Sequence, residues 1–197
     1  AYRMAATFAA RLSAATSSAV AAHCHRITEV AGERIWAELA NLFSVADSAG
    51  TLRAMAASGL LTAIFPELRP AMGCRQNRHH QYDVFEHSLQ AYGHLETLLA
   101  RWDHCWTDLA AATAPADPKP DPAILRYSAL LHDVGKPAVR RVDRHGQARF
   151  YGHAAKGANI TAGISRRLRL SKKQRHAADA IVRHHIRPLF LFLAAGN

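Results

Sequence analysis

The sequence predicts an all-α protein that carries one small β-hairpin. Forty of its 197 residues are alanine, the residue with the highest helix propensity. Apolar residues recur at helical spacing, most clearly over residues 29–43, where Ile35, Leu39, Leu42 and Phe43 share one face. Strand-like segments flanking a turn occur at one place. These observations favour a bundle of helices over a sheet protein.

In the first half of the chain, local signals mark where helices begin and end. Gly59 is placed to end one helix, Pro66 to stop a short helical turn, and Asp83 to cap the next helix. The predicted helices span residues 3–12, 18–26, 29–43, 48–58, 60–65 and 84–99. The predicted loops span residues 69–82 and 114–122, and the second contains four prolines.

The second half contains the predicted hairpin between helices. Pro122 at the start and Gly135 past the end bracket a helix over 123–132. Residues 139–142 and 148–151 flank the polar turn 143–147 and predict the two strands. Helices follow over 157–170 and 172–184, the second with Ser171 as its cap.

Composition excludes several classes of protein. Hydrophobic residues make up 49% of the chain, which excludes a disordered protein, and the longest apolar stretch, 188–195, is too short to span a membrane. Three cysteines, an odd number at wide spacing, argue against a disulfide scaffold and for a reducing compartment. We therefore expect a cytoplasmic protein with no membrane partner.

The positive charge is concentrated in the last third of the chain. The net charge is +10, yet residues 134–197 contain 14 Lys and Arg against 2 acidic residues. A basic surface of this kind attracts polyanions such as RNA or phosphorylated ligands. A solvated, arginine-rich helix face explains the same charge equally well.

The segment Ala-Leu-Leu-His-Asp-Val-Gly-Lys-Pro, residues 129–137, is the strongest chemical signal. His132 and Asp133 follow an apolar helix, so an imidazole and a carboxylate can converge on one divalent cation. Gly135 lets the chain turn away, and Lys136 places a positive charge where a phosphate would lie.

Further histidines supply ligands that one pair cannot. His87, His153 and His185 lie in separate segments, and each alone is consistent with a hydrogen-bonded or surface histidine; that they join the pair around a metal is what the family resemblance described below implies. The remaining candidates are expected to be surface or hydrogen-bonded histidines: His23, His25, His94, His104, His145 and His176.

Four strings in this order resemble the HD superfamily of metal-dependent phosphohydrolases, and more closely the bacterial tRNA nucleotidyltransferases (CCA-adding enzymes and related poly(A) polymerases) that carry an HD domain. The strings are residues 76–89, 130–137, 150–153 and 182–188. Residues 2–12 are similar to the stretch entering that family's neck, and residues 33–39 to its neck motif. The resemblance implies a helical neck over 1–47 and an HD-type helical bundle over 48–197.

The resemblance also implies a site and a chemistry. It places His87, His132 and Asp133 on one divalent ion and His153 and His185 on a second, with Mg, Mn, Ni, Co, Fe or Zn as candidates. Phosphoester hydrolysis is the implied reaction, on RNA (tRNA) or a nucleotide phosphoester, with Lys136 and Asp133 as catalytic residues. The candidate RNA- or phosphate-binding residues are Arg140, Arg141, His79 and His80; a loop-capping role for the two histidines is equally consistent with the sequence.

Two departures from the family are visible. The motifs of the nucleotidyl-transfer head match nothing here and would lie before Ala1, so this chain alone is not expected to transfer nucleotides. The family completes a one-metal site with a later Asp, but nothing past Pro188 is acidic, and Asp179 is expected at the surface. We therefore expect a C-terminally incomplete HD domain.

Three hypotheses remain open at this point. The chain is the neck and HD portion of a tRNA nucleotidyltransferase, an independent HD phosphohydrolase acting on a small nucleotide, or a degenerate HD fold that only positions RNA.

Overall fold

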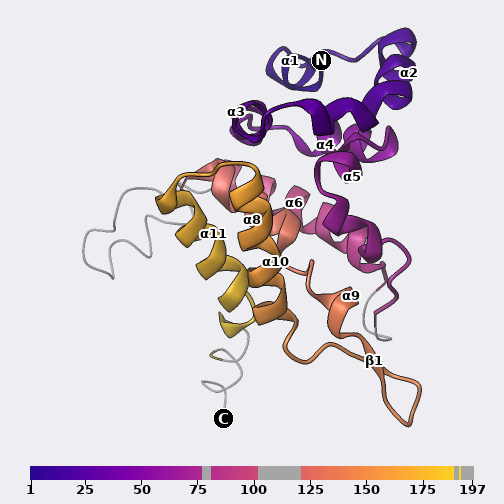
Figure 1. Ribbon diagram of the computed structural model, residues 1–197, viewed down its shortest axis with the longest axis vertical. Coiled ribbons are helices and arrows are strands. Elements are labelled where there is room, and N and C mark those ends of the chain that lie inside the picture. Colours follow the sequence, from indigo (N-terminus) through magenta and orange to yellow (C-terminus); the bar gives the residue numbers. More distant parts are fainter. Residues whose placement is uncertain (77–80, 102–120, 189–190, 192–197) are drawn as a thin grey trace.

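The computed structural model describes residues 1–76, 81–101, 121–188 and 191, and within them it is helical apart from one hairpin (Figure 1). This confirms the predicted fold class. The N-terminal elements are α1 (Tyr2–Thr7), α2 (Ala14–His23), the 3-10 helix η1 (Cys24–Glu29), α3 (Gly32–Phe43), α4 (Ala49–Ala57), α5 (Leu60–Ile64) and η2 (Pro66–Ala71). The later elements are α6 (Val84–Ala100), α8 (Pro122–Leu131), α9 (Lys136–Val139), β1 (Arg141–Val142), β2 (Ala148–Arg149), α10 (His153–Arg167) and α11 (Lys172–His184).

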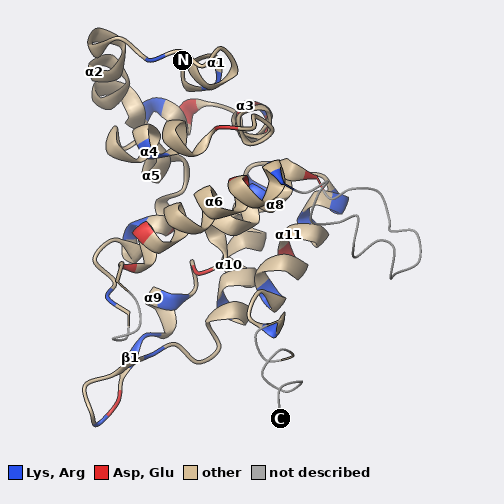
Figure 2. Cartoon of the chain, turned by 180° about the vertical axis from the view of Figure 1, so that it is seen from behind, with Lys and Arg blue, Asp and Glu red and all other residues tan. Residues whose placement is uncertain are grey.

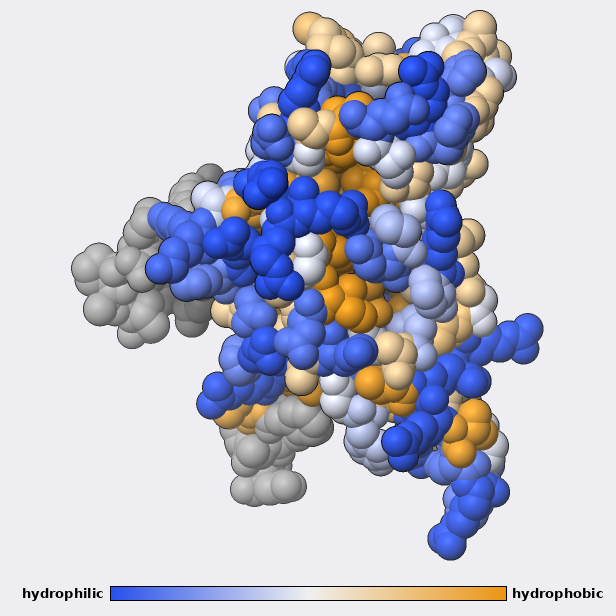
Figure 3. All heavy atoms as spheres, viewed as in Figure 1, coloured by the Kyte–Doolittle hydropathy of each residue, from blue (hydrophilic) through white to orange (hydrophobic). Residues whose placement is uncertain are grey.

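One hydrophobic core joins the N-terminal helices to the later bundle. The amphipathic helix α3 buries Trp36, Leu39, Leu42 and Phe43. The Trp36 ring meets the Tyr127 ring of α8 edge to face, with 5.4 Å between centroids. In the space-filling view from the direction of Figure 1, hydrophobic side chains are visible along the middle of the molecule, between hydrophilic borders (Figure 3). The predicted boundary at 47/48 therefore falls inside a shared core, and it stays a prediction.

A buried acid ties the two halves together. The Glu96 carboxylate on α6 accepts hydrogen bonds from the backbone N–H groups of Ser48 (2.7 Å) and Ala49 (2.9 Å) and from the Ser48 hydroxyl. Arg126 on α8 lies 3.4 Å from the same carboxylate. Removing one partner of such a buried set leaves the other charge without compensation, so the set holds the start of α4 against α6 and α8.

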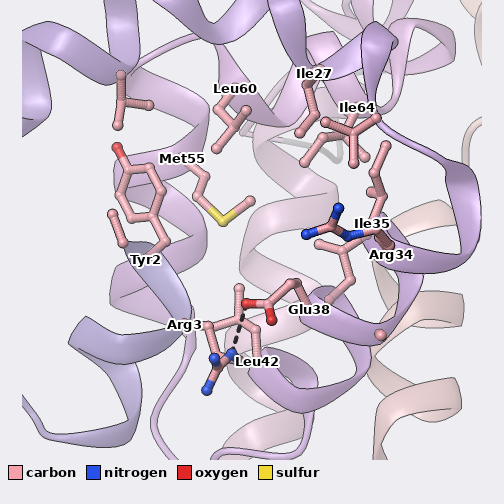
Figure 4. Close-up of a pocket in the computed structure, with 15 residues that line it drawn as sticks. Tyr2, Arg3, Ile27, Arg34, Ile35, Glu38, Leu42, Met55, Leu60 and Ile64 are labelled. Atoms are coloured by element: carbon pink, nitrogen blue, oxygen red, sulfur yellow. Dashed lines mark hydrogen bonds and ion pairs between the residues drawn. The ribbon is translucent and has the colours of Figure 1, made fainter.

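The N-terminal helices line an open pocket of about 450 Å³ (Figure 4). Its walls are mainly apolar, with Tyr2 from α1, Ile35 from α3 and Met55 from α4. The Arg3 Nε donates to Glu38 Oε2 at 2.7 Å at its edge. None of its lining residues belongs to the predicted metal site.

Helix boundaries predicted from side-chain caps are confirmed. The Asp83 carboxylate accepts from the Glu86 N–H and begins α6, and Ser171 forms a capping box with Gln174 at the start of α11. Gly59 adopts a left-handed φ of 79° between α4 and α5, the conformation that its predicted role requires.

Other predicted boundaries are wrong. The first helix ends at Thr7 rather than Leu12, because Ala9 turns the chain with a φ of 48°. Val139 belongs to the short helix α9, so the first strand is only Arg141–Val142 and its partner only Ala148–Arg149. Helix α10 begins four residues before the predicted Gly157. The predicted loop 69–82 begins inside η2, while most of the proline-rich segment 114–122 lies outside the described residues.

In the part of the chain that the structure describes, no helix has both the length and the apolar character needed to cross a membrane.

Close backbone contact at Gly135 sets the turn from α8 into α9 against α10. A Cβ added at Gly135 would overlap the carbonyl of His153 and the backbone of Gly157. In contrast, a Cβ at Gly163, also on α10, would meet nothing within 4 Å. The chain between His132 and Lys136 can therefore approach α10 only with glycine at this position.

We predict that Gly135→Ala lowers the free energy of unfolding by about 1–3 kcal/mol, because two backbone segments must move apart. Gly163→Ala is the matched control and should stabilise by about 0.5–1 kcal/mol through its higher helix propensity. Chemical denaturation measures both. Equal stabilities for the wild type and Gly135→Ala would contradict the close contact.

Candidate metal centre

Asp133 is the centre of a cluster of histidines. It follows α8 directly, and the apolar Leu130 and Leu131, both fully buried, bring the end of that helix into the interior. Asp133 is 1% exposed. A buried carboxylate requires compensation by positive charge or hydrogen bonds.

The first group of ligand atoms surrounds Asp133 Oδ2. The Nε2 atom of His132, at the C-cap of α8, lies 3.0 Å from it, and the Nε2 atom of His87, on α6, lies 3.3 Å from it. The two Nε2 atoms are 3.2 Å apart. These three side chains form one group that could hold a metal ion.

The second group surrounds the other carboxylate oxygen. His153 is the first residue of α10 and His185 caps the end of α11, and their Nε2 atoms lie 3.4 and 3.5 Å from Asp133 Oδ1. Their Nε2 atoms are also 3.2 Å apart. Asp133 therefore belongs to both groups and could bridge two ions.

Hydrogen bonds on the far side of three rings determine which nitrogen carries the proton. The Nδ1 atoms of His132, His153 and His185 lie 2.8, 2.8 and 2.7 Å from the carbonyl oxygens of the residues three positions before them. A carbonyl oxygen only accepts, so each Nδ1 must carry hydrogen. In the neutral ring, Nε2 then directs a lone pair toward Asp133.

In this arrangement the buried Asp133 Oδ1 has no hydrogen-bond donor among the described residues. The lone pairs of His153 and His185 face each other, and Asp133 Oδ1 accepts no hydrogen bond from the described residues. Burial lowers the pKa of His153, which disfavours a proton on that ring as the compensating charge. Imidazole nitrogens and a carboxylate are good ligands for a divalent first-row metal, and backbone acceptors commonly orient metal-bound histidines. The residues therefore fit one or two metal ions.

Asp133 is held in its charged form. Burial alone would raise its pKa, but hydrogen bonds from the imidazoles of His132, His185 and His87, which His132 and His185 can donate only when the ring carries a second hydrogen on Nε2, hold the pKa below its usual range. The ionised carboxylate is the form that binds metal.

Lys136 adds a fixed positive charge beside the cluster. Its Nζ lies 2.7 Å from Asp133 Oδ2 and donates to Gln76 Oε1 at 2.7 Å. The ammonium group also lies 5.6 Å from the centre of the Phe150 ring. Gln76 and Phe150 were not predicted as site residues. Neither is chemically distinctive in sequence, and their positions follow from the fold.

The other predicted residues lie elsewhere. Arg140 and Arg141 follow α9 and do not join the cluster; Arg140 Nε donates to the Arg75 carbonyl at 3.3 Å. His79 and His80 lie outside the described residues. Asp179 pairs with Arg183 at 2.8 Å and supplies no ligand.

The histidines expected at the surface are exposed where the structure describes them: His23, His25, His94, His145 and His176. His104 lies outside the described residues.

Two protein families match successive parts of the chain. A family described as "Probable RNA and SrmB- binding site of polymerase A" matches residues 11–72. The HD domain family matches residues 84–190, more than half of the chain, and that range contains all five residues of the cluster.

Relatives of known activity extend the comparison. The chain is 36% identical to the A-adding tRNA nucleotidyltransferase of Deinococcus radiodurans over 82% of its own length and 33% of the relative's. It is 34% identical to the CC-adding tRNA nucleotidyltransferase of Thermus thermophilus over 93% of its length and 39% of the relative's. A bifunctional uridylyltransferase/uridylyl-removing enzyme of Ruegeria pomeroyi is 29% identical over 68% of the chain and 14% of the relative. The chain thus spans less than two-fifths of each.

We predict that the purified chain, loaded with Mn²⁺ or Ni²⁺ and then desalted, retains up to about two ions per molecule by elemental analysis, because Asp133 bridges two ligand groups. Bound metal should also stabilise the fold, by about 2.7 kcal/mol at a hundred times the dissociation constant. Asp133→Asn should abolish both effects. His176→Asn, which changes an exposed histidine outside the cluster, is the control. Metal retention by Asp133→Asn equal to that of the control would contradict the assignment.

Proposed function

Because the chain belongs to the HD domain family and is homologous to tRNA nucleotidyltransferases over most of its length, we propose that it serves tRNA 3′-end processing and that its Asp133 centre hydrolyses a phosphoester. It resembles the neck and HD region of CCA-adding and poly(A) polymerase family proteins. The proposed substrate is an RNA end or a nucleotide phosphoester.

A single observation carries the hydrolytic part of the proposal. The Nε2 atoms of His153 and His185 converge on the buried Asp133 Oδ1, and no described residue donates a hydrogen bond to that oxygen. One or two divalent ions bound by the two groups, His87, His132 and Asp133 and Asp133, His153 and His185, would supply the Lewis-acid chemistry of phosphoester hydrolysis. A relative named as a uridylyl-removing enzyme also matches part of the chain.

The chain's own residues orient the substrate and balance its charge. Lys136 is 8% exposed and is held between Asp133 and Gln76, so its ammonium group has little freedom and weak solvent screening. A fixed cation of this kind stabilises negative charge that develops on phosphoryl oxygens, at no cost of reorganisation. Lys136 is therefore the proposed electrostatic catalyst, and Asp133 orients the ligand groups from a buried position.

A second candidate function is an HD fold that binds RNA without hydrolysis. The specific observation in its favour is the Lys136 ammonium, which lies 2.7 Å from Asp133 Oδ2 and already balances one negative charge. In this alternative the cluster is structural, and the basic last third of the chain, with 14 Lys and Arg against 2 acids, binds RNA.

A hydrolysis assay separates the two. We predict that the metal-loaded chain hydrolyses p-nitrophenyl phosphate or bis-p-nitrophenyl phosphate, and that EDTA stops the reaction. Lys136→Met should lower kcat by about 10²–10³-fold through loss of electrostatic stabilisation, and Asp133→Asn by at least as much. His176→Asn should retain wild-type rates.

Absence of turnover with every divalent metal tested, together with unchanged RNA binding in Asp133→Asn, would support the RNA-binding alternative and overturn the hydrolytic proposal.

A further inference from the structure

A second hollow, outside the metal cluster, lies beside the hairpin. It has a volume of about 440 Å³, which is within the range of small-ligand sites. Its polar lining consists of Arg140, Arg141, Arg149 and Tyr151. Basic residues also line the path from α9 into β1 (Figure 2). The hollow therefore combines three guanidinium groups with one aromatic ring.

Two of the positive charges in this hollow repel each other across the hairpin and so destabilise it. Arg141 and Arg149 are directly opposed in the antiparallel pair, and like charges at such positions repel each other. Asp143 Oδ2 accepts from Arg149 Nε at 2.8 Å and relieves part of this repulsion. Among the described residues, the Arg141 side chain has no hydrogen bond or ion pair. An anion in the hollow would compensate it.

Tyr151 is exposed to a degree that packing does not explain. The residue is 82% exposed, the largest value among the exposed large hydrophobic residues of the described chain. An aromatic face next to arginines is the arrangement that stacks an unpaired nucleobase while cations bind the neighbouring phosphates. An acidic peptide would use the arginines but not this ring.

The hollow and the metal cluster share two short segments. Tyr151 lies two residues before the cluster residue His153. The preceding residue, Phe150, contacts the cluster twice. Its carbonyl oxygen accepts a hydrogen bond from His153 Nδ1, and its ring lies 5.6 Å from the Lys136 ammonium group. Arg140 lies four residues after Lys136 and is fixed to the Arg75 carbonyl. The hollow and the metal cluster are therefore built on neighbouring residues of the same two segments.

We propose that this hollow binds an unpaired nucleotide near the end of a single-stranded RNA, with the base on Tyr151 and the adjacent phosphates on Arg140, Arg141 and Arg149. Single-stranded RNA is then the substrate class of the Asp133 centre. Hydrolysis of the bound RNA end rests on the proposed function, whereas binding in the hollow does not. Bases in a duplex are already stacked on their neighbours and cannot stack on the Tyr151 ring.

Binding without turnover tests the hollow. A fluorescein-labelled single-stranded RNA of eight nucleotides is titrated with the full chain in EDTA, and fluorescence anisotropy is followed at several KCl concentrations. Tyr151→Ala should weaken binding about tenfold, and Tyr151→Phe, which keeps the ring, should bind as the wild type does. A blunt-ended duplex RNA, which has no unpaired nucleotide, should bind equally to all three.

The salt dependence separates the arginines from the tyrosine. Arg141→Ala removes one phosphate contact and should lower the slope of log K against log salt by about 0.7, whereas Tyr151→Ala should leave that slope unchanged. Arg166→Ala removes an exposed arginine on α10 outside the hollow and is the control for net charge.

The failures of this inference and of the proposed function are distinguishable. Equal affinity of Tyr151→Ala, Tyr151→Phe and the wild type, or equal loss in Arg141→Ala and Arg166→Ala, overturns the hollow whatever the hydrolysis assay shows. Binding that depends on Tyr151 in a chain without any metal-dependent hydrolysis supports the hollow and overturns the proposed reaction.

Discussion

The structure depends on how one buried carboxylate is compensated. Asp133 is withdrawn from water at the end of α8, and four imidazoles and one ammonium group are brought to it from α6, α8, α9, α10 and the end of α11. Four of these five groups lie at helix ends: His132 and His185 are C-cap residues, and Lys136 and His153 are the first residues of α9 and α10. The position of each group therefore depends on where its helix begins or ends. His87 is the exception, because it lies inside α6.

Local chemistry explains which features could be predicted from the sequence. The caps at Asp83 and Ser171 need only a side chain and a neighbouring N–H group, so they were predictable from spacing. The start of α10 was not, because Gly152 adopts a φ of 78° and lets the helix begin at His153, a choice that depends on the packing of the turn. The short strands were overestimated because α9 takes Val139 into its last turn.

The pair His132 and Asp133 was identifiable because it directly follows an apolar helix, whereas His87, His153 and His185 were singled out among thirteen histidines by the family resemblance; the structure brings all five together. Their supporting residues were not. Gln76 lies in a polar loop and Phe150 follows a strand, and only the folded chain shows that both contact Lys136. The same limit applies to Tyr151, whose exposure is a property of the surface and not of its neighbours in sequence.

The three carbonyl-bonded imidazoles have a consequence for motion. His132, His153 and His185 each hydrogen-bond the carbonyl three residues back, at a helix start or end, where backbone hydrogen bonds ordinarily open first. A cation bound by the Nε2 atoms of these three histidines would stabilise all three helix ends together. Metal binding would then slow backbone amide hydrogen exchange at these three helix ends, which are far apart in sequence. Loss of the ion would raise the exchange rate at all three.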